Sequence, residues 1–189
     1  MATTDKFPVV FLDRDGTIIV DKIFLNNPDE IEFLDGVIDG LKKLYDAGFK
    51  LVVVTNQSGI ARGLVQLENL YAIHKKISEV LNQHGVEIYR YYFCPHMPDS
   101  GCECRKPNTG AVKEIIDYVD KENSFMIGDK DTDVGFGKNL GVKTILLTTT
   151  GSIQGLKWEP DFIAKNFKEA VDIVLKTKKD QNYKWRIET

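Results

Sequence analysis

The chain has 189 residues, of which 42% are hydrophobic and 28% charged, with a formal net charge of −3 and a pI near 5.7. These values are typical of one globular domain, and they exclude a chain that is disordered over most of its length. The weak acidity gives no reason to expect nucleic acid or an anionic membrane as a partner. No apolar run approaches the roughly 18 residues that span a bilayer, and residues 1–6 are not followed by a signal-peptide core, so we expect a cytoplasmic protein.

The first predicted strand, residues 7–12, ends at two carboxylates. The run is short, β-branched and aromatic, which is typical of a strand buried on both faces of a sheet. Asp13 and Asp15 follow it with one residue between them, and Gly16 comes next. Two carboxylates so close repel each other unless a cation or a shared proton lies between them, and Mg²⁺ is the hard cation that suits oxygen ligands. A turn built from Asp and Gly is the alternative reading of this stretch alone.

After residues 17–33, which are predicted to form an irregular loop over this edge, strand and helix patterns alternate along the chain. Apolar residues at helical spacing predict helices over residues 36–47, 66–83, 110–120, 131–140 and 167–175, with Thr109 as a cap of the third. Short apolar runs predict further strands over residues 49–54, 88–93, 124–127, 142–147 and 162–163. This alternation predicts an α/β fold, a mostly parallel sheet with helices on both faces.

The predicted elements form a single domain over residues 1–176. Within it, residues 94–107 form a cysteine-rich loop. Residues 177–189 are polar and rich in lysine, and we expect this tail to have little order.

Polar side chains follow several strands of the predicted sheet. Thr55 and its neighbours Asn56, Gln57 and Ser58 end the second strand, Asp129 and Lys130 end the fourth, and Arg105 and Lys106 come from the loop after the third. Because the carboxyl ends of parallel strands meet at one edge, these groups are expected to converge with Asp13 and Asp15.

This convergence outlines a phosphate site. The carboxylates would hold Mg²⁺, and Lys106, the Thr55 hydroxyl and backbone N–H groups would hold phosphoryl oxygens. One Asp could attack phosphorus and form an aspartyl-phosphate, as carboxylate nucleophiles do. The other could protonate the leaving oxygen and then activate water.

Three cysteines and a histidine lie within eleven residues, as Cys94, His96, Cys102 and Cys104. Their odd number and crowding argue against disulfides and for a metal. Three thiolates and one imidazole are the usual ligands of a closed tetrahedral Zn²⁺ site, which leaves no position for water and is therefore structural. Zinc would pin the loop and so place Arg105 and the lysine after it. Unrelated cysteines and a surface histidine are the alternative.

The stretch Asp13-Arg14-Asp15-Gly16-Thr17 resembles the D-x-D-G-T motif of the haloacid dehalogenase superfamily of phosphatases. Thr55 matches the second motif of that superfamily, Lys106 the third, and Gly128-Asp129-Lys130 with Asp133 the fourth. The resemblance covers residues 9–151. It implies a Rossmann-like sheet with a minimal cap, Asp13 as nucleophile and Asp15 as general acid and base. It also implies Mg²⁺ on Asp13, the Asp15 backbone carbonyl and Asp129.

Within that superfamily, Cys-Pro-His followed by Cys-x-Cys-Arg-Lys-Pro resembles two groups with a zinc loop, the D-glycero-D-manno-heptose 1,7-bisphosphate 7-phosphatases and the histidinol-phosphate phosphatases. The run Thr-Asn-Gln-Ser-Gly-Ile-Ala-Arg-Gly at residues 55–63 is similar to the first group, whereas the five-residue gap between His96 and Cys102 is like the second. Resemblance to the first group implies substrate contacts from Asp21 and Phe24. Two phosphates would also use an added cation such as Arg62 or Arg105.

We therefore expect a Mg²⁺-dependent phosphomonoesterase on a small phosphorylated metabolite, with the heptose bisphosphate favoured and histidinol phosphate as the alternative. The expected substrate contacts are Asp21, Phe24, Thr55, Asn56, Gln57, Ser58, Arg62, Arg105, Lys106 and Lys130.

Two other classes of function stay open, a non-catalytic zinc-loop binding module and an enzyme acting on nucleic-acid ends. The acidic pI and the lack of aromatic residues among the basic ones speak against nucleic acid. We expect a monomer with neither a nucleic acid nor a membrane as partner. His74 and His84 lie on a helical stretch, as surface or core-edge residues, and we assign neither a role.

Overall fold

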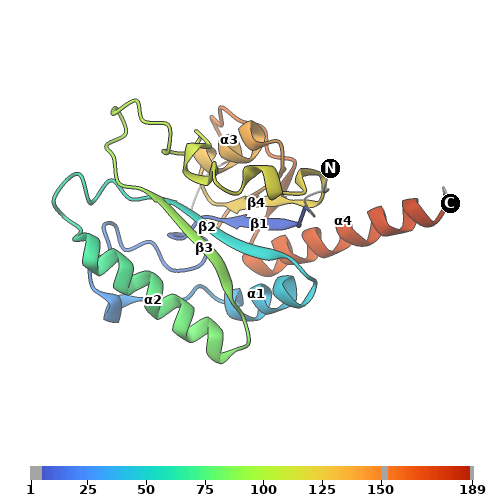
Figure 1. Ribbon diagram of the computed structural model, residues 1–189, viewed down its shortest axis with the longest axis horizontal. Coiled ribbons are helices and arrows are strands. Elements are labelled where there is room, and N and C mark those ends of the chain that lie inside the picture. The colour runs from blue at the N-terminus through green and yellow to red at the C-terminus, as the bar shows by residue number, and fades with distance from the viewer. Residues whose placement is uncertain (1–5, 150–152, 188–189) are drawn as a thin grey trace.

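The computed structural model describes residues 6–149 and 153–187, and within them it contains one six-stranded sheet (Figure 1). The strand order is β3-β2-β1-β4-β5-β6, and every neighbouring pair is parallel. The predicted α/β fold with a parallel sheet is confirmed. The strands are β1 (Val9–Leu12), β2 (Lys50–Asn56), β3 (Ile88–Cys94), β4 (Phe125–Gly128), β5 (Lys143–Leu147) and β6 (Phe162–Ala164).

Helices cover both faces of the sheet. Helix α3 (Asp131–Leu140) lies on one face, and the other face carries α1 (Val37–Asp46), α2 (Leu67–Gln83) and the beginning of α4 (Phe167–Ile187) (Figure 1). Residues of β1 alternate between the two cores: Val10 and Leu12 pack with α1, α2 and α4, whereas Val9 and Phe11 pack with α3. All four are fully buried, as expected for a strand covered on both sides.

The last helix is longer than predicted. It continues to Ile187, past the predicted end at residue 175, and so includes most of the predicted tail. The apolar periodicity fades there, but residues 176–187 contain neither Gly nor Pro, and four of them are Lys, a residue that favours helix. Residues 188–189 lie outside the described part, and the domain boundary at residue 176 stays a prediction.

The predicted helix over residues 110–120 is wrong. The chain instead forms three 3₁₀ turns, η2 (Gly110–Val112), η3 (Ile116–Tyr118) and η4 (Lys121–Asn123), and the Thr109 side chain makes no capping hydrogen bond. The Phe7 N–H donates to the Tyr118 carbonyl and the Asp120 N–H donates to the Phe7 carbonyl, each at 2.9 Å. This pairing holds Val119 extended beside Phe7, which a continuous helix would not allow.

The sheet reverses its winding direction at β1. The chain passes from β1 to β2 and β3 on one side, and then crosses back to β4, β5 and β6 on the other. In open α/β sheets the loops diverge at such a switch point, and ligands bind at the carboxyl ends of the strands there. Asp13 follows β1 and Asp129 follows β4, so both lie at this point. No helix in the described ranges is long and apolar enough to cross a membrane.

Candidate active site

A cavity of about 430 Å³ opens at the carboxyl edge of the sheet. The predicted site residues that line it are Asp13, Asp15, Asp21, Phe24, Thr55, Asn56, Gln57, Ser58, Arg105, Lys106 and Lys130. Of the remaining predicted residues, Asp129 and Arg62 lie outside this lining. Asp129 is almost buried beside the cavity, and Arg62 is exposed near its rim, with its guanidinium carbon 5.7 Å from the centre of the Phe24 ring.

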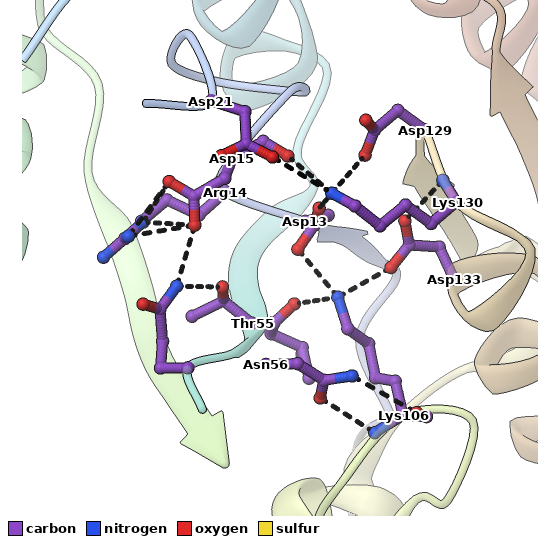
Figure 2. A network of polar contacts seen from close by, with 12 residues as sticks. Asp13, Arg14, Asp15, Asp21, Thr55, Asn56, Lys106, Asp129, Lys130 and Asp133 are labelled. Carbon is purple, nitrogen blue, oxygen red and sulfur yellow. Dashed lines mark hydrogen bonds and ion pairs between the residues drawn. The ribbon is translucent and has the colours of Figure 1, made fainter. Parts of the chain in front are cut away.

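The centre of the site is a buried ammonium between two carboxylates (Figure 2). The Lys106 Nζ lies 2.8 Å from Asp13 Oδ1 and 2.6 Å from Asp133 Oδ1, and it donates to the Val54 carbonyl at 2.6 Å. Burial by itself would raise the pKa of Asp13, but the charges of Lys106 and Lys130 outweigh it and hold that pKa below its ordinary value. Asp13 is therefore ionised at neutral pH.

Asp15 has a different environment. Both of its oxygens accept from Arg14, from Nη2 at 2.9 Å and from Nε at 3.2 Å, and its Oδ2 accepts from Gln57 Nε2 at 2.7 Å. Burial raises the pKa of Asp15, the Arg14 guanidinium opposes this, and the Asp13 carboxylate reinforces it, so that the pKa lies above its ordinary value. The pKa values of the two neighbouring carboxyl groups are thus shifted in opposite directions, as expected for a nucleophile beside a general acid.

The Lys130 ammonium lies among the oxygens predicted to hold Mg²⁺ (Figure 2). Its Nζ is 3.4 Å from Asp129 Oδ1, 3.5 Å from the Asp15 carbonyl and 4.0 Å from Asp13 Oδ2. Carboxylate oxygens of Asp13, Asp129 and Asp133 also lie within 4.8 Å of one another. Carboxylate and carbonyl oxygens gathered around one point fit a divalent cation such as Mg²⁺.

Gly16, in the first motif, lies so close to Asp129, in the fourth, that only glycine fits at this position. Gly16 has φ +81°, and a Cβ built on it would lie 2.3 Å from Asp129 Oδ2. Any larger residue would therefore displace the Asp129 carboxylate and strain the backbone.

The side-chain amides of Asn56 and Gln57, at the end of β2, form hydrogen bonds with other protein groups. Asn56 clamps the backbone of Lys106: its Oδ1 accepts from the Lys106 N–H at 2.9 Å, and its Nδ2 donates to the Lys106 carbonyl at 3.2 Å. Gln57 donates to Thr55 Oγ1 at 2.8 Å as well as to Asp15. Both residues therefore contact groups that are predicted to be catalytic, and their own contact with substrate stays a prediction.

The loop at residues 94–107 brings its four predicted ligands together. Cys94 Sγ lies 3.5 Å from both His96 Nδ1 and Cys102 Sγ, and Cys104 Sγ lies 3.2 Å from His96 Nδ1 and 3.6 Å from Cys102 Sγ. Thiolates around a tetrahedral zinc ion are roughly 3.8 Å apart, given Zn–S bonds of about 2.3 Å. The donor set and its spacing therefore fit Zn²⁺.

The rim of the cavity carries a strained turn. Ile23 and Phe24 have φ of 49° and 59°, in the left-handed region that β-branched and aromatic residues rarely adopt. Asp21 Oδ1 accepts from the Ile23 N–H at 3.0 Å, and Asp21 Oδ2 lies 3.6 Å from the Lys130 Nζ. The ring of Phe24 is 41% exposed at the cavity mouth.

Three residues without a predicted role lie at or behind the site. Asp133 belongs to the fourth motif, but its contact with Lys106 joins elements that only the fold brings together. Arg14 lies between Asp13 and Asp15, just after the buried strand β1, and a solvent-exposed arginine is unexpected at that position. His74 shares the apolar face of α2 with Ile73 and Ile77, and this placement was the signal that it is buried.

Comparisons with known proteins agree with this geometry. The family described as polynucleotide kinase 3 phosphatase matches residues 8–145. A D-glycero-beta-D-manno-heptose-1,7-bisphosphate 7-phosphatase from Yersinia pestis is 40% identical over 156 residues, covering 77% of this chain and 83% of that protein. The enzyme of the same name from Helicobacter pylori (strain J99) is 38% identical over 176 residues, 91% of this chain and 98% of its own.

A solved structure extends the likeness to three dimensions. The D,D-heptose 1,7-bisphosphate phosphatase from B. bronchiseptica, crystallised with magnesium and phosphate, has a TM-score of 0.81 and 32% identity. The alignment covers 90% of this chain and 99% of that one. The chain is therefore a phosphatase of the haloacid dehalogenase type and belongs to the polynucleotide kinase 3 phosphatase family.

Proposed function

We propose that the protein removes the 7-phosphate of D-glycero-D-manno-heptose 1,7-bisphosphate and thereby serves the supply of heptose for surface glycans such as lipopolysaccharide. The observation that carries the chemistry is the pair of carboxyl groups after β1, in which Lys106 helps to hold the pKa of Asp13 below its ordinary value while burial raises the pKa of Asp15 above it. The names of relatives with about 40% identity support the choice of substrate.

In the proposed first step, an ionised oxygen of Asp13 attacks the phosphorus atom, and the bond from phosphorus to the sugar oxygen breaks. Asp15 gives its proton to that oxygen, so the sugar leaves as an alcohol and an aspartyl-phosphate remains. Lys106 and the Thr55 hydroxyl contact the phosphoryl oxygens and offset their charge. Bound Mg²⁺, held by Asp13, the Asp15 carbonyl and Asp129, would supply further charge neutralisation.

In the second step, Asp15 is ionised and accepts a proton from water. The resulting hydroxide attacks the phosphorus of the aspartyl-phosphate, the bond to the Asp13 oxygen breaks, and inorganic phosphate leaves. Both steps use the same carboxyl group of Asp15, first as acid and then as base, so each turnover restores the starting protonation state.

The remaining predicted contacts are assigned to the sugar and its second phosphate. Arg105 lines the cavity and, with the exposed Arg62 at its rim, offers cations for the distal phosphate. Asp21 and Phe24 stand at the mouth, where a sugar hydroxyl and a sugar face would contact a carboxylate and a ring. Ser58 and Lys130 complete the contacts along the lining.

We also propose that Cys94, His96, Cys102 and Cys104 hold a structural Zn²⁺. Replacing Cys104 by Ser removes one ligand, and we expect bound zinc to fall from about one ion per chain to less than roughly a tenth. The melting temperature is expected to fall by about 5 °C or more, because a lost structural metal costs several kcal/mol. Elemental analysis and thermal unfolding measure the two effects.

Asp99→Asn, an exposed change in the same loop, is the matched control and is expected to keep its zinc. A wild-type protein that retains no metal after purification in zinc-containing medium would contradict the assignment. If elemental analysis finds a stoichiometric amount of iron in place of zinc, the ion bound by the four residues is iron.

The substrate is tested by comparing kcat/KM for phosphate release with Mg²⁺ from three compounds on one zinc-loaded preparation. These are heptose 1,7-bisphosphate, histidinol phosphate and an oligonucleotide that ends in a 3′-phosphate. We expect the bisphosphate to be preferred by at least about a hundredfold, since its distal phosphate adds charge-assisted hydrogen bonds to Arg62 and Arg105. Preference for histidinol phosphate would show that the five-residue gap between His96 and Cys102 predicts the substrate better than the run at residues 55–63. Preference for the oligonucleotide would favour the activity that the family description names.

A further inference from the structure

Arg14 is a buried arginine that faces the cavity on one side only. Its side chain is 1% exposed, and its Nε and Nη2 contact both oxygens of Asp15. Figure 2 shows the guanidinium on the side of Asp15 away from Lys130. A planar guanidinium facing a carboxylate at two nitrogens fixes the plane of that carboxylate as well as its charge.

The other end of the guanidinium is held by a histidine of α2. Arg14 Nη1 lies 3.4 Å from His74 Nε2, and His74 is 6% exposed. A guanidinium has only donors, so His74 accepts through an unprotonated Nε2. Burial and the charge of Arg14 lower the pKa of His74 to about 3, in agreement with a neutral ring at every working pH.

His74 is itself fixed by β3. Its ring stacks on the Tyr91 ring with centroids 4.5 Å apart and planes 15° apart, and the Tyr91 hydroxyl lies 2.8 Å from Ser78 Oγ, one turn further along α2. The Arg14 side chain is thus enclosed between the loop after β1, α2 and β3. Arg14 itself lines the cavity, whereas His74, Ser78 and Tyr91 do not, and these three residues together determine where the Arg14 side chain can lie.

We propose that Arg14 and His74 are positioning residues for the general acid: His74 orients the Arg14 guanidinium, and Arg14 together with Gln57 orients the Asp15 carboxyl group toward the leaving oxygen. This inference rests on the proposed role of Asp15. Removing the acceptor at His74 leaves Arg14 with an unpaired buried N–H, and the guanidinium can then turn away from Asp15. Proton delivery to the leaving group is the step that suffers.

The substitution His74→Leu removes the acceptor and keeps the position apolar, and His74→Gln keeps an acceptor at the place of Nε2. The readout is kcat/KM with Mg²⁺ for p-nitrophenyl phosphate, whose leaving group needs little protonation, and for phenyl phosphate, whose leaving group needs more. We expect His74→Leu to lose about tenfold or more on phenyl phosphate and less than about threefold on p-nitrophenyl phosphate. We expect His74→Gln to stay within about threefold of the wild type on both.

His84→Leu is the matched control, because His84 lies immediately after the same helix and is exposed, and the one side-chain contact described for it is with the Val80 carbonyl, 2.9 Å from Nδ1. It is expected to match the wild type on both esters. Equal losses on the two esters in His74→Leu would overturn the positioning role, since a merely structural defect lowers both together. The positioning role would also be overturned if His74→Gln lost as much kcat/KM on phenyl phosphate as His74→Leu.

The aryl esters carry no sugar, so this test separates the inference from the choice of substrate. Hydrolysis of aryl esters by a wild-type enzyme that leaves heptose bisphosphate intact would refute the proposed substrate alone. A wild-type enzyme with the same kcat/KM for both aryl esters would show that proton delivery does not limit this step, and that result would overturn the inference.

Discussion

Replacing Asp13 by Asn is expected to lower kcat by about four orders of magnitude or more, because an amide oxygen of nearly the same shape cannot form the aspartyl-phosphate. The fold is expected to survive, since Lys106 keeps Asp133 and the Val54 carbonyl as partners. The measurement is phosphate release at saturating substrate, with thermal unfolding of the same preparation.

Asp29→Asn is the matched control for this change. Asp29 lies on the surface, where its side chain is 84% exposed and pairs with Lys76 at 2.7 Å. An exposed ion pair contributes little, so activity is expected to be unchanged. Turnover above about a tenth of the wild-type rate in Asp13→Asn would refute Asp13 as nucleophile.

Replacing Lys106 by Met is expected to damage both stability and activity. The Lys106 side chain is 2% exposed and forms ion pairs with Asp13 and Asp133, whose side chains are 6% and 2% exposed. Removing the cation leaves two buried carboxylates that the more distant Lys130, 4.0 Å from Asp13 Oδ2, compensates only in part, and breaking a buried pair in this way typically costs about 3–5 kcal/mol of unfolding free energy. Asp13 also loses the main charge that keeps it ionised, so kcat is expected to fall by about a hundredfold or more.

The comparison for this prediction is Lys138→Met. Lys138 pairs with Asp161 at 2.6 Å, but both side chains are about one-third exposed, and such a pair contributes about 1 kcal/mol or less. Urea unfolding of the two variants measures the difference directly. A loss below about 1 kcal/mol in Lys106→Met would contradict the description of Lys106 as the charge that balances the site.

Much of the fold could be predicted because its signals are local. The run Val9–Leu12 and the similar runs at β2 and β4 are short and apolar, and the helices between them keep a clear helical period. Parallel strands with their carboxyl ends at one edge then place Asp13, Thr55 and Asp129 together without further information.

What could not be predicted depends on contacts between distant residues. The segment at residues 110–120 has a helical apolar pattern, and it is Phe7, more than a hundred residues earlier, that holds Val119 extended. The sequence predicts the amide of Asn56 as a substrate contact, and its hydrogen bonds to the Lys106 backbone appear only when the loop at residues 94–107 is folded beside β2.

The contact between the buried side chains of Arg14 and His74, behind the site, also joins residues that are distant in the sequence. Arg14 and His74 are sixty residues apart and meet because α2 packs against the sheet beside β3. Their pairing is a property of tertiary packing, and neither residue has a local pattern that identifies its partner.

The most direct test of the account is a rapid acid quench of the enzyme during turnover of heptose 1,7-bisphosphate that carries a radioactive phosphorus at C7. An aspartyl-phosphate at Asp13 predicts label on the protein within the first turnover. Peptide mapping is expected to locate the label at Asp13, unlabelled substrate is expected to chase it into inorganic phosphate, and Asp13→Asn is expected to carry none. Phosphate release without any protein-bound label, or label on another residue, would contradict it.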